Sequence, residues 1–469
     1  MESHQRESHL QHTKLGRRRC RVILFPFPLQ GHINPMLQLA SILYSRGISI
    51  TIIHTKFNSP NSSNYPHFNF FSFQDGLSEI EASTADVVSL TSLLNIKFLV
   101  PFQDCLVKVL SNNVDHQENS DSSTGCLIVD AAWNITQAIP ETCKLPWITL
   151  RTTSVCSFLA FAALPLLQEN GALAMFDSKS EALLPELPPL RVKDLPLVKT
   201  DHPETFVQLV SDLVVNQIKI SSGVIWNSFQ ALEQDSLNKL HQDFPIPMFP
   251  IGPFHNYFTA SSSSLLSQDQ TSISWLDKQA PNSVIYVSFG SIAKVNKTEF
   301  LEIAWGLANT NLPFLWVVRT GLVHGAEWID PLPERFLEKL SGRGHIVKWA
   351  PQPQVLAHSA IGGFWTHSGW NSTLESICEG VPMICQPYFG DQMVNARYVS
   401  DVWRVGFHLE RRLERGEIEK VIRRLMVGIE GQEMRDRIVS LKEKVDVCLR
   451  QGGSSHQALE KLINYIMSL

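Results

Sequence analysis

The chain has 469 residues, of which 44% are hydrophobic and 18% are charged, and its formal net charge at pH 7 is −5. This length is enough for two domains with separate cores, and the composition is ordinary for a globular protein. The small negative charge gives no general attraction to nucleic acid or to an anionic membrane, so neither is an expected partner. No apolar run reaches the ~18 residues that a membrane-spanning helix needs.

The first 20 residues are polar and include the basic run Arg17–Arg19. We expect residues 1–20 to form a flexible tail, because they hold no apolar run of the kind that a secretory signal requires. Eight cysteines are scattered singly, without a C-x-x-C pair or a His/Cys cluster. Reduced thiols, no bound metal and a cytoplasmic location are the expectation.

After the tail, apolar strand-like runs alternate with segments of helical spacing. This order predicts a doubly wound parallel sheet in an N-terminal domain, residues 21–248. Residues 31–35 are expected to be a loop, because Pro35 suits the first turn of a helix over residues 36–44. The predicted strands are residues 21–27, 48–54, 126–129 and 147–150.

Two polar residues fall at the carboxyl ends of predicted strands, where ligands bind in open α/β sheets. His32 follows the first strand, and Asp130 ends the strand that begins at Cys126. A histidine here can take a proton from a hydroxyl, and an aspartate behind it can fix its tautomer. From the residues alone the pairing stays open, because a lone loop histidine is the commoner situation.

Around residues 249–280 the alternation breaks into a polar, serine-rich stretch that is expected to link two domains. A second alternating series occupies residues 281–454 and predicts a second parallel sheet. A final helix over residues 455–469 is expected to return to the first domain. The second set of predicted strands is residues 284–289, 314–318, 346–348, 361–365 and 382–385.

The segment from Trp349 to Gln392 carries the most specific chemistry in the chain. Trp349 follows a predicted strand, and its indole can stack on a nucleobase. His367 lies just before a predicted helix whose free N–H groups suit a diphosphate, with Gly369 giving a tight turn and Asn371 or Ser372 a cap. Ser372 and Glu375 also have the spacing of a capping box, which by itself means only a helix start.

The spacing of these residues resembles the donor-sugar box of plant family-one UDP-glycosyltransferases, which transfer glucose from UDP-glucose to small molecules. The runs Gly223–Ser228 and Ile251–His255 are similar to the subgroup that includes steviol-glycoside and cytokinin glucosyltransferases. This resemblance covers nearly the whole chain after residue 20. It implies the GT-B fold, in which two Rossmann-like domains face each other across a cleft.

The resemblance also implies a role for each matching residue. His32 becomes the general base of an inverting transfer, oriented by Asp130, and Gln392 is associated with glucose as the sugar. The implied donor-binding residues are Ser291, Trp349, Ala350, Gln352, His367, Gly369, Trp370, Asn371, Ser372, Glu375, Asp391, Gln392 and Thr152. The implied acceptor-binding residues are Gly31, Trp133, Phe158, Tyr388 and Phe389, with the loop Gln74–Leu77 nearby.

Other protein classes fit the sequence less well. An NAD-dependent dehydrogenase needs G-x-G-x-x-G after a strand, and the nearest match, Gly342–Val347, lacks the third glycine. The chain holds no D-x-D pair, so a metal-independent reaction without a cofactor is expected, with UDP-glucose as co-substrate. A monomer acting on a small lipophilic hydroxyl or carboxyl acceptor is the expectation. N-glucosylation of a cytokinin-like base and non-catalytic sugar-nucleotide binding remain alternatives.

Overall fold

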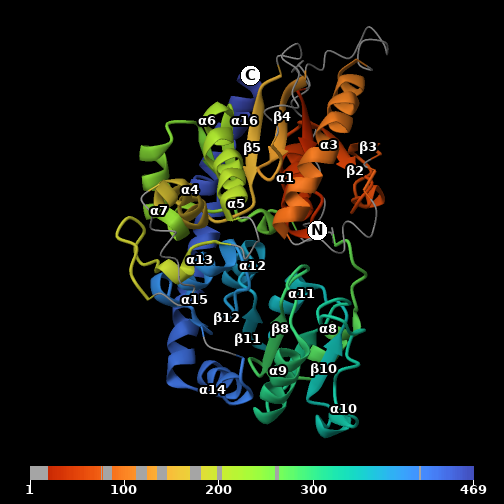
Figure 1. Ribbon diagram of the computed structural model, residues 1–469, viewed down its shortest axis with the longest axis vertical. Coiled ribbons are helices and arrows are strands. Elements are labelled where there is room, and N and C mark those ends of the chain that lie inside the picture. The colour runs from red at the N-terminus through yellow and green to blue at the C-terminus, as the bar shows by residue number, and fades with distance from the viewer. Residues whose placement is uncertain are drawn as a thin grey trace, which may run out of the picture.

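The computed structural model describes residues 20–74, 76–77, 87–111, 124–134, 145–169, 181–197, 203–258, 264–410 and 413–469. Residues 1–19 of the predicted tail, residue 75 of the predicted acceptor loop and Cys143 lie outside these ranges. Figure 1 shows two α/β domains, with the N-terminal one above and the C-terminal one below. Within the described ranges, no helix has the length and apolar character needed to cross a membrane.

The N-terminal domain is built on a seven-stranded parallel sheet with the order β3-β2-β1-β4-β5-β6-β7. Two of its inner strands, β1 and β6, are buried along their whole length, as expected where helices cover both faces of a parallel sheet. The strands are β1 (Arg21–Phe25), β2 (Ser49–Thr55), β3 (Asn69–Phe73), β4 (Thr124–Asp130), β5 (Trp147–Arg151), β6 (Gly223–Trp226) and β7 (Met248–Pro250). The helices are α1 (Gln30–Ser45), α3 (Val87–Ser111), α4 (Val155–Glu169), α5 (Pro203–Val210), α6 (Gln217–Ile220) and α7 (Gln230–Asp243).

The C-terminal domain repeats this plan with a six-stranded parallel sheet of order β10-β9-β8-β11-β12-β13. The strands are β8 (Val284–Ser288), β9 (Phe314–Val317), β10 (Gly344–Val347), β11 (Ile361–Thr366), β12 (Met383–Cys385) and β13 (Gly406–His408). The helices are α8 (Thr271–Leu276), α9 (Lys297–Asn309), α10 (Phe336–Lys339), α11 (Gln352–Leu356), α12 (Trp370–Glu379), α13 (Asp391–Arg397), α14 (Arg415–Met426), α15 (Ile429–Leu449) and α16 (Ser454–Ser468).

Each sheet has one point where the chain changes direction, between β1 and β4 in the first sheet and between β8 and β11 in the second. Ligands of doubly wound sheets bind at such points, beyond the carboxyl ends of the strands. The predicted residues His32 and Asp130 follow β1 and end β4, while Ser291 and His367 follow β8 and β11. The topology therefore brings two candidate half-sites to the cleft between the domains.

Helices from each domain pack against the other, which holds the two half-sites together. Leu459, Leu462 and Ile466 of α16 join the apolar core formed by β1, β2 and α1, and α16 contacts β4 and β7. In Figure 1, α16 (dark blue) lies among N-terminal elements. Val394 of α13 likewise packs into the core around α4.

One local prediction is wrong, because residues 30–35 are helical. α1 begins at Gln30, so Pro35 is an interior residue of the helix and His32 lies in its first turn. Proline has no N–H group to donate to the carbonyl four residues earlier, which here belongs to Gly31. That carbonyl accepts a hydrogen bond of 2.8 Å from Asn371 Nδ2 of the other domain.

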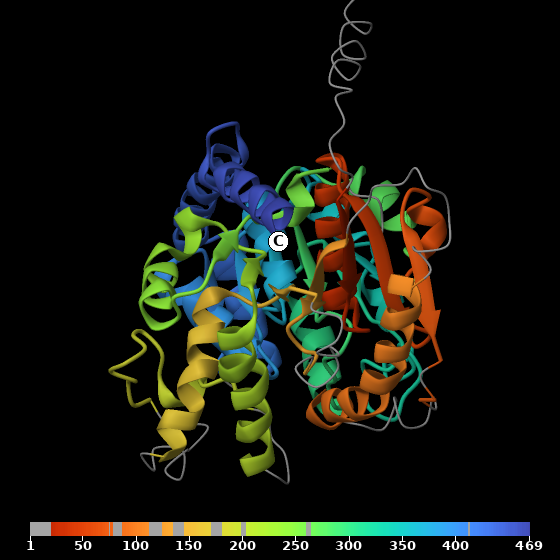
Figure 2. The ribbon, with the colours of Figure 1, turned by 90° about the horizontal axis from the view of Figure 1, so that it is seen from above.

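A helical wall that the sequence analysis missed borders the cleft. α5 continues through a π-helical turn, Ser211–Asn216, into α6, and α5 lies beside α4 (Figure 2). The sequence does indicate a helix here, because the apolar residues 206, 209, 210, 213 and 214 recur at helical spacing.

Candidate active site

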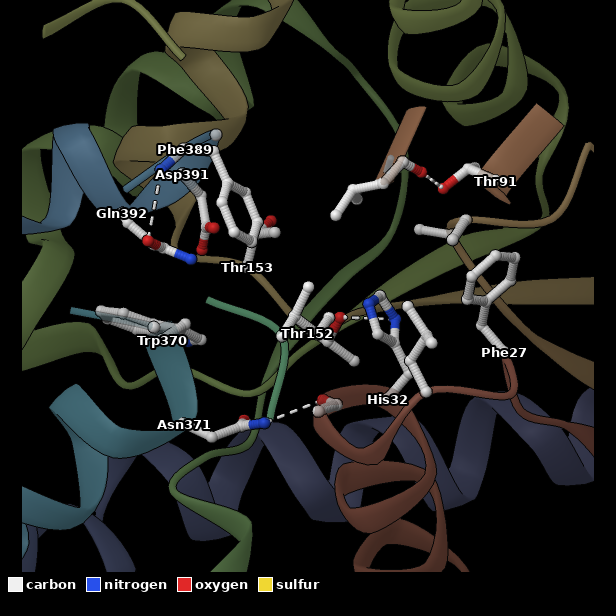
Figure 3. A pocket seen from close by; sticks show the side chains of 18 of the residues that line it. Phe27, His32, Thr91, Thr152, Thr153, Trp370, Asn371, Phe389, Asp391 and Gln392 are labelled. Carbon is white, nitrogen blue, oxygen red and sulfur yellow. Dashed lines mark hydrogen bonds between the residues drawn. The ribbon is translucent and has the colours of Figure 1, made fainter. Parts of the chain in front are cut away.

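A cavity of about 400 Å³ lies between the two switch points and is lined by both domains. Figure 3 shows His32 and Thr152 on one side, with Trp370, Asp391 and Gln392 on the other. Of the predicted site residues, it is lined by Gly31, His32, Asp130, Thr152, Phe158, Ser291, Trp349, His367, Gly369, Trp370, Asn371, Ser372, Phe389, Asp391 and Gln392. A smaller adjoining cavity of about 110 Å³ is lined by Trp349, Ala350, Gln352 and Glu375.

His32 and Asp130 form the predicted pair although they are 98 residues apart in the chain. The His32 Nδ1 atom lies 2.9 Å from Asp130 Oδ2 and 3.1 Å from Oδ1. Asp130 is fully buried, and the His32 side chain is 27% exposed. Because Nδ1 is held by the carboxylate, Nε2 is the nitrogen left to accept a proton.

The charge of Asp130 increases the proton affinity of His32. Burial lowers the pKa of His32, but the charge and hydrogen bond of Asp130 outweigh burial, and the net effect is a raised pKa. Asp391, from the other domain, adds a smaller effect in the same direction. Thr152 Oγ1 lies 3.2 Å from His32 Nδ1, so this residue, predicted to contact the sugar, contacts the base in the structure.

The His367 ring lies just before α12, in contact with Gly369 at the N-terminus of this helix and with Gly290 after β8. A β-carbon on Gly369 would lie 2.5 Å from His367 Nε2, and one on Gly290 would lie 2.6 Å from the same atom. Gly369 is therefore needed because the His367 ring lies too close to its backbone for a side chain. The turn itself is made by Ser368, with φ +65°. Burial lowers the pKa of His367 to about 4, and Arg319 acts in the same direction, so the ring is neutral at pH 7.

The predicted helix caps on α12 are wrong. Gly369 is the N-cap residue, and no side chain caps this helix. Asn371 and Ser372 are inside the first turn, where Asn371 bonds to Gly31 O. The first-turn N–H groups of α12 therefore have no side-chain cap, which leaves the helix end suited to an anion.

Gln352 connects the residues of the smaller cavity. Its Nε2 donates to Ser372 Oγ at 2.9 Å and to Glu375 Oε2 at 2.7 Å, so Glu375 closes no capping box. Its Oε1 accepts from Tyr286 at 3.2 Å. Burial raises the pKa of Glu375 to about 7. Trp349 shares both cavities and donates through its indole N–H to Ser264 at 2.9 Å.

Asp391 and Gln392 begin α13 and face the cavity with complementary groups (Figure 3). The Oε1 atom of Gln392 accepts from the backbone N–H groups of Tyr388 and Phe389 at 2.9 and 3.3 Å. The amide oxygen is therefore occupied, and the NH₂ group is the part of this side chain that remains for a ligand. Burial raises the pKa of Asp391 to about 6.

Two predicted contact residues, Trp133 and Tyr388, lie outside the cavity lining, and a third, Trp370, has its indole N–H occupied. Trp133 is fully buried, stacks on Phe25 and donates to Pro26 O at 3.2 Å, so its ring lies in the core and not on the cavity. Tyr388 lies outside the cavity lining and packs on Phe289. Trp370 lines the cavity, but its indole N–H donates to Asn227 O at 2.8 Å across the domain junction.

The described residues contain no cluster of three His, Cys, Asp or Glu side chains arranged to hold a metal ion. The seven described cysteines are all free thiols.

Known proteins resemble this chain over almost its whole length. Residues 21–441 match the family model described as UDP-glucoronosyl and UDP-glucosyl transferase. UDP-glycosyltransferase 76B1 of Arabidopsis thaliana is 55% identical, with 95% of this chain and 98% of that one covered. UDP-glycosyltransferase 76G1 of Stevia rebaudiana is 46% identical, with 97% and 98% covered.

Solved structures agree with the fold. A UDP-glucosyltransferase from Polygonum tinctorium capable of glucosylating indoxyl has a TM-score of 0.82 at 27% identity, with 97% of this chain and 100% of that one covered. Phytolacca americana UGT2, solved with UDP-2fluoro-glucose and pterostilbene, has a TM-score of 0.80 at 26% identity, with 95% and 99% covered. The two facing parallel-sheet domains are thus those of a GT-B glycosyltransferase. The chain belongs to the UDP-glucoronosyl and UDP-glucosyl transferase family and groups with its plant members.

Proposed function

We propose that this UDP-glycosyltransferase transfers glucose, with inversion, from UDP-glucose to a hydroxyl of a small lipophilic acceptor. The observation that carries the proposal is the His32–Asp130 pair, which leaves one ring nitrogen of a raised-pKa histidine on the cavity. His32 Nε2 takes the acceptor proton, the acceptor oxygen attacks the anomeric carbon, and the electron pair of the breaking bond leaves on UDP. Asp130 stabilises the imidazolium that forms.

On the donor side we propose that Trp349 stacks on the base and that Glu375 accepts from the ribose. Ser291, neutral His367 and the first turn of α12, with Asn371 and Ser372, would bind the diphosphate. Asp391 and the NH₂ group of Gln392 would contact the sugar. Ala350 and Gln352 support the smaller cavity that suits the nucleoside.

On the acceptor side, Gly31, Phe158 and Phe389 line the cavity and are the predicted contact residues that support an apolar acceptor. The division into an acceptor domain (21–248), a linker (249–280), a donor domain (281–454) and a returning helix (455–469) is part of the proposal. A monomer and a cytoplasmic location stay predictions.

The test of the function is incubation of the full chain with UDP-glucose and a panel of lipophilic alcohols, phenols, acids and amines. Mass spectrometry should detect a mass gain of one hexose on hydroxyl acceptors, with UDP released in equal amount. Transfer only to ring nitrogen would favour the N-glucosylation alternative. UDP-glucose binding without transfer to any acceptor would favour a binding protein.

A donor-site prediction concerns Gly369. The Gly369→Ala variant should lose UDP affinity by about ten- to a hundredfold, because its β-carbon would displace His367, and overpacking costs ~1–3 kcal/mol. Titration calorimetry with UDP would measure the change. Gly416→Ala is the matched control, since a β-carbon there meets nothing within 4 Å. Unchanged UDP affinity in Gly369→Ala would remove His367 from the phosphate site.

A second prediction concerns the choice of sugar. UDP-glucose should be used at least about tenfold more efficiently than UDP-galactose, which requires only ~1.4 kcal/mol. The axial hydroxyl of galactose would leave the Gln392 NH₂ group without its partner. Gln392→Glu keeps an oxygen for the N–H groups of Tyr388 and Phe389 but removes that donor. This variant should transfer glucose more slowly and should show a smaller preference for UDP-glucose over UDP-galactose, while its UDP affinity stays constant. Equal use of both sugars by the wild type would contradict the assignment.

A further inference from the structure

A buried cation forms part of the cavity wall on the acceptor side. Arg151, the last residue of β5, is 5% exposed, and among the described lining residues it is the only lysine or arginine. Its contacts are Phe158, Leu213 and Val214, which all line the same cavity. The guanidinium therefore lies in the wall itself, between the aromatic ring of α4 and the π-helical turn after α5.

The contacts of Arg151 among the described residues include no ion pair. Nη2 donates to Leu213 O at 2.8 Å and to Val214 O at 3.3 Å, and the guanidinium carbon lies 4.9 Å from the centre of the Phe158 ring. Nε is buried and has no hydrogen-bond partner among the described residues. Within the described ranges no carboxylate forms an ion pair with this side chain. A buried charge is normally paired, because removing it from water is costly.

Asp130, on the neighbouring strand β4, acts on Arg151 through its charge but forms no ion pair with it. Both of its oxygens lie against His32 Nδ1, and Oδ1 also accepts from the N–H of Ala132 at 2.9 Å. Burial lowers the pKa of Arg151 to about 10, and the charge of Asp130 opposes this effect only in part. Arg151 is therefore still a cation at neutral pH, and its charge is free to meet an anion in the cavity.

We propose that Arg151 binds a carboxylate on the acceptor, so that the preferred acceptors are small lipophilic hydroxy acids. The inference rests on the proposed function, in which a hydroxyl of the same molecule meets His32. Thr152, the next residue, contacts His32 at 3.2 Å, so one end of β5 holds both the base and the anion site. The apolar side chains of Phe161, Leu209 and Val210 would enclose the carbon skeleton.

In this arrangement the carboxylate anchors the acceptor and the hydroxyl reacts. The hydroxyl proton passes to His32 Nε2, the oxygen forms the new bond to the anomeric carbon, and UDP leaves with the electron pair of the broken bond. The product is a glucoside that keeps its free carboxylate, and not a glucose ester. An ester is cleaved by mild base, whereas a glucoside survives it, so the two products are easily told apart.

The experiment compares hydroxy acids, aliphatic and aromatic, with their own primary amides as acceptors for the full chain. The amide has the same shape and hydroxyl but no charge. We expect kcat/KM to be about ten- to a hundredfold higher for the acid, as a charge-assisted pair with a buried arginine predicts, and the product to be stable to base. Equal kcat/KM for acid and amide would overturn the inference.

Two variants of Arg151 test whether its side chain recognises the acceptor carboxylate or only supports the π-helical turn. Arg151→Met should abolish the preference for acid over amide, mainly by raising KM for the acid, and Arg151→Lys should keep part of it. Thr91→Val, another polar lining residue, should change both acceptors by the same factor. A parallel loss of acid and amide turnover in Arg151→Met would show a structural role and contradict the proposal.

A measurement on the wild type covers the case in which the variants do not fold. A carboxylic acid that lacks the hydroxyl should inhibit competitively against the hydroxy acid, at least about tenfold better than its amide does. Equal inhibition by the two would overturn the inference. If amides and neutral alcohols are glucosylated but acids are not preferred, only this inference fails. If no acceptor is glucosylated, the proposed function fails instead.

Discussion

Replacing His32 with alanine is expected to lower kcat by about 10²–10⁴-fold, the usual range for loss of a general base. UDP affinity should stay near that of the wild type, because the proposed UDP contacts come from the other domain. Single-turnover kinetics with a hydroxyl acceptor and calorimetric titration with UDP measure the two quantities. His241→Ala, at the exposed end of α7, is the control and should match the wild type. Near-normal kcat in His32→Ala would refute the assignment.

The pH profile gives an independent check on the same residue. Asp130 raises the pKa of His32, and the base must be unprotonated to work, so kcat/KM should rise with pH through a value above the ordinary ~6.5. In Asp130→Asn that charge is lost, so the rise should move to lower pH and the maximal rate should fall less than in His32→Ala. A rise at the same pH in both proteins would separate Asp130 from the titrating group.

Breaking the buried ion pair between the domains is expected to destabilise the protein by about 3–5 kcal/mol. Arg397 of α13 donates from Nε to Asp194 Oδ2 at 2.8 Å and from Nη2 to Asp194 Oδ1 at 3.0 Å. The two side chains are 3% and 2% exposed. Arg397→Met would leave Asp194 as a buried carboxylate without its cation. Thermal unfolding should show a clear fall in Tm, and KM for UDP-glucose should rise, because α13 also carries Asp391 and Gln392.

An exposed ion pair provides the matched control. Arg424 and Glu430 pair on the surface with side chains 43% and 53% exposed, so Arg424→Met should cost no more than about 1 kcal/mol. The double variant Arg397→Met with Asp194→Leu should recover part of the loss, because no buried carboxylate is left at position 194. The other carboxylates that pair with Arg397, Asp401 and Glu410, are 34% and 31% exposed and remain solvated. Equal Tm values for Arg397→Met and Arg424→Met would show that the domain junction does not depend on this pair.

Much of the fold was predictable because local patterns carry it. Buried parallel strands read as unbroken apolar runs, and the strands beginning near residues 21, 48, 126, 147, 284, 314 and 361 were predicted within a few residues. Short strands such as β13, with three residues, were missed because they give too little periodicity. Residues 31–35 were predicted to be a loop because Pro35 usually marks a first turn. In the structure the missing N–H group is compensated by Asn371 from the other domain.

The sequence by itself determined the class of protein, since the spacing from Trp349 to Gln392 and the residues His32 and Asp130 identify a nucleotide-sugar site and a base. Only the tertiary structure decided which groups remain free for ligand. The tertiary structure occupied the Gln392 oxygen with two backbone N–H groups and placed Trp133 in the core. It also left the buried Nε of Arg151 without a hydrogen-bond partner among the described residues. The physical reason is that hydrogen-bond satisfaction and burial depend on partners distant in the chain, which periodicity and motif spacing do not specify.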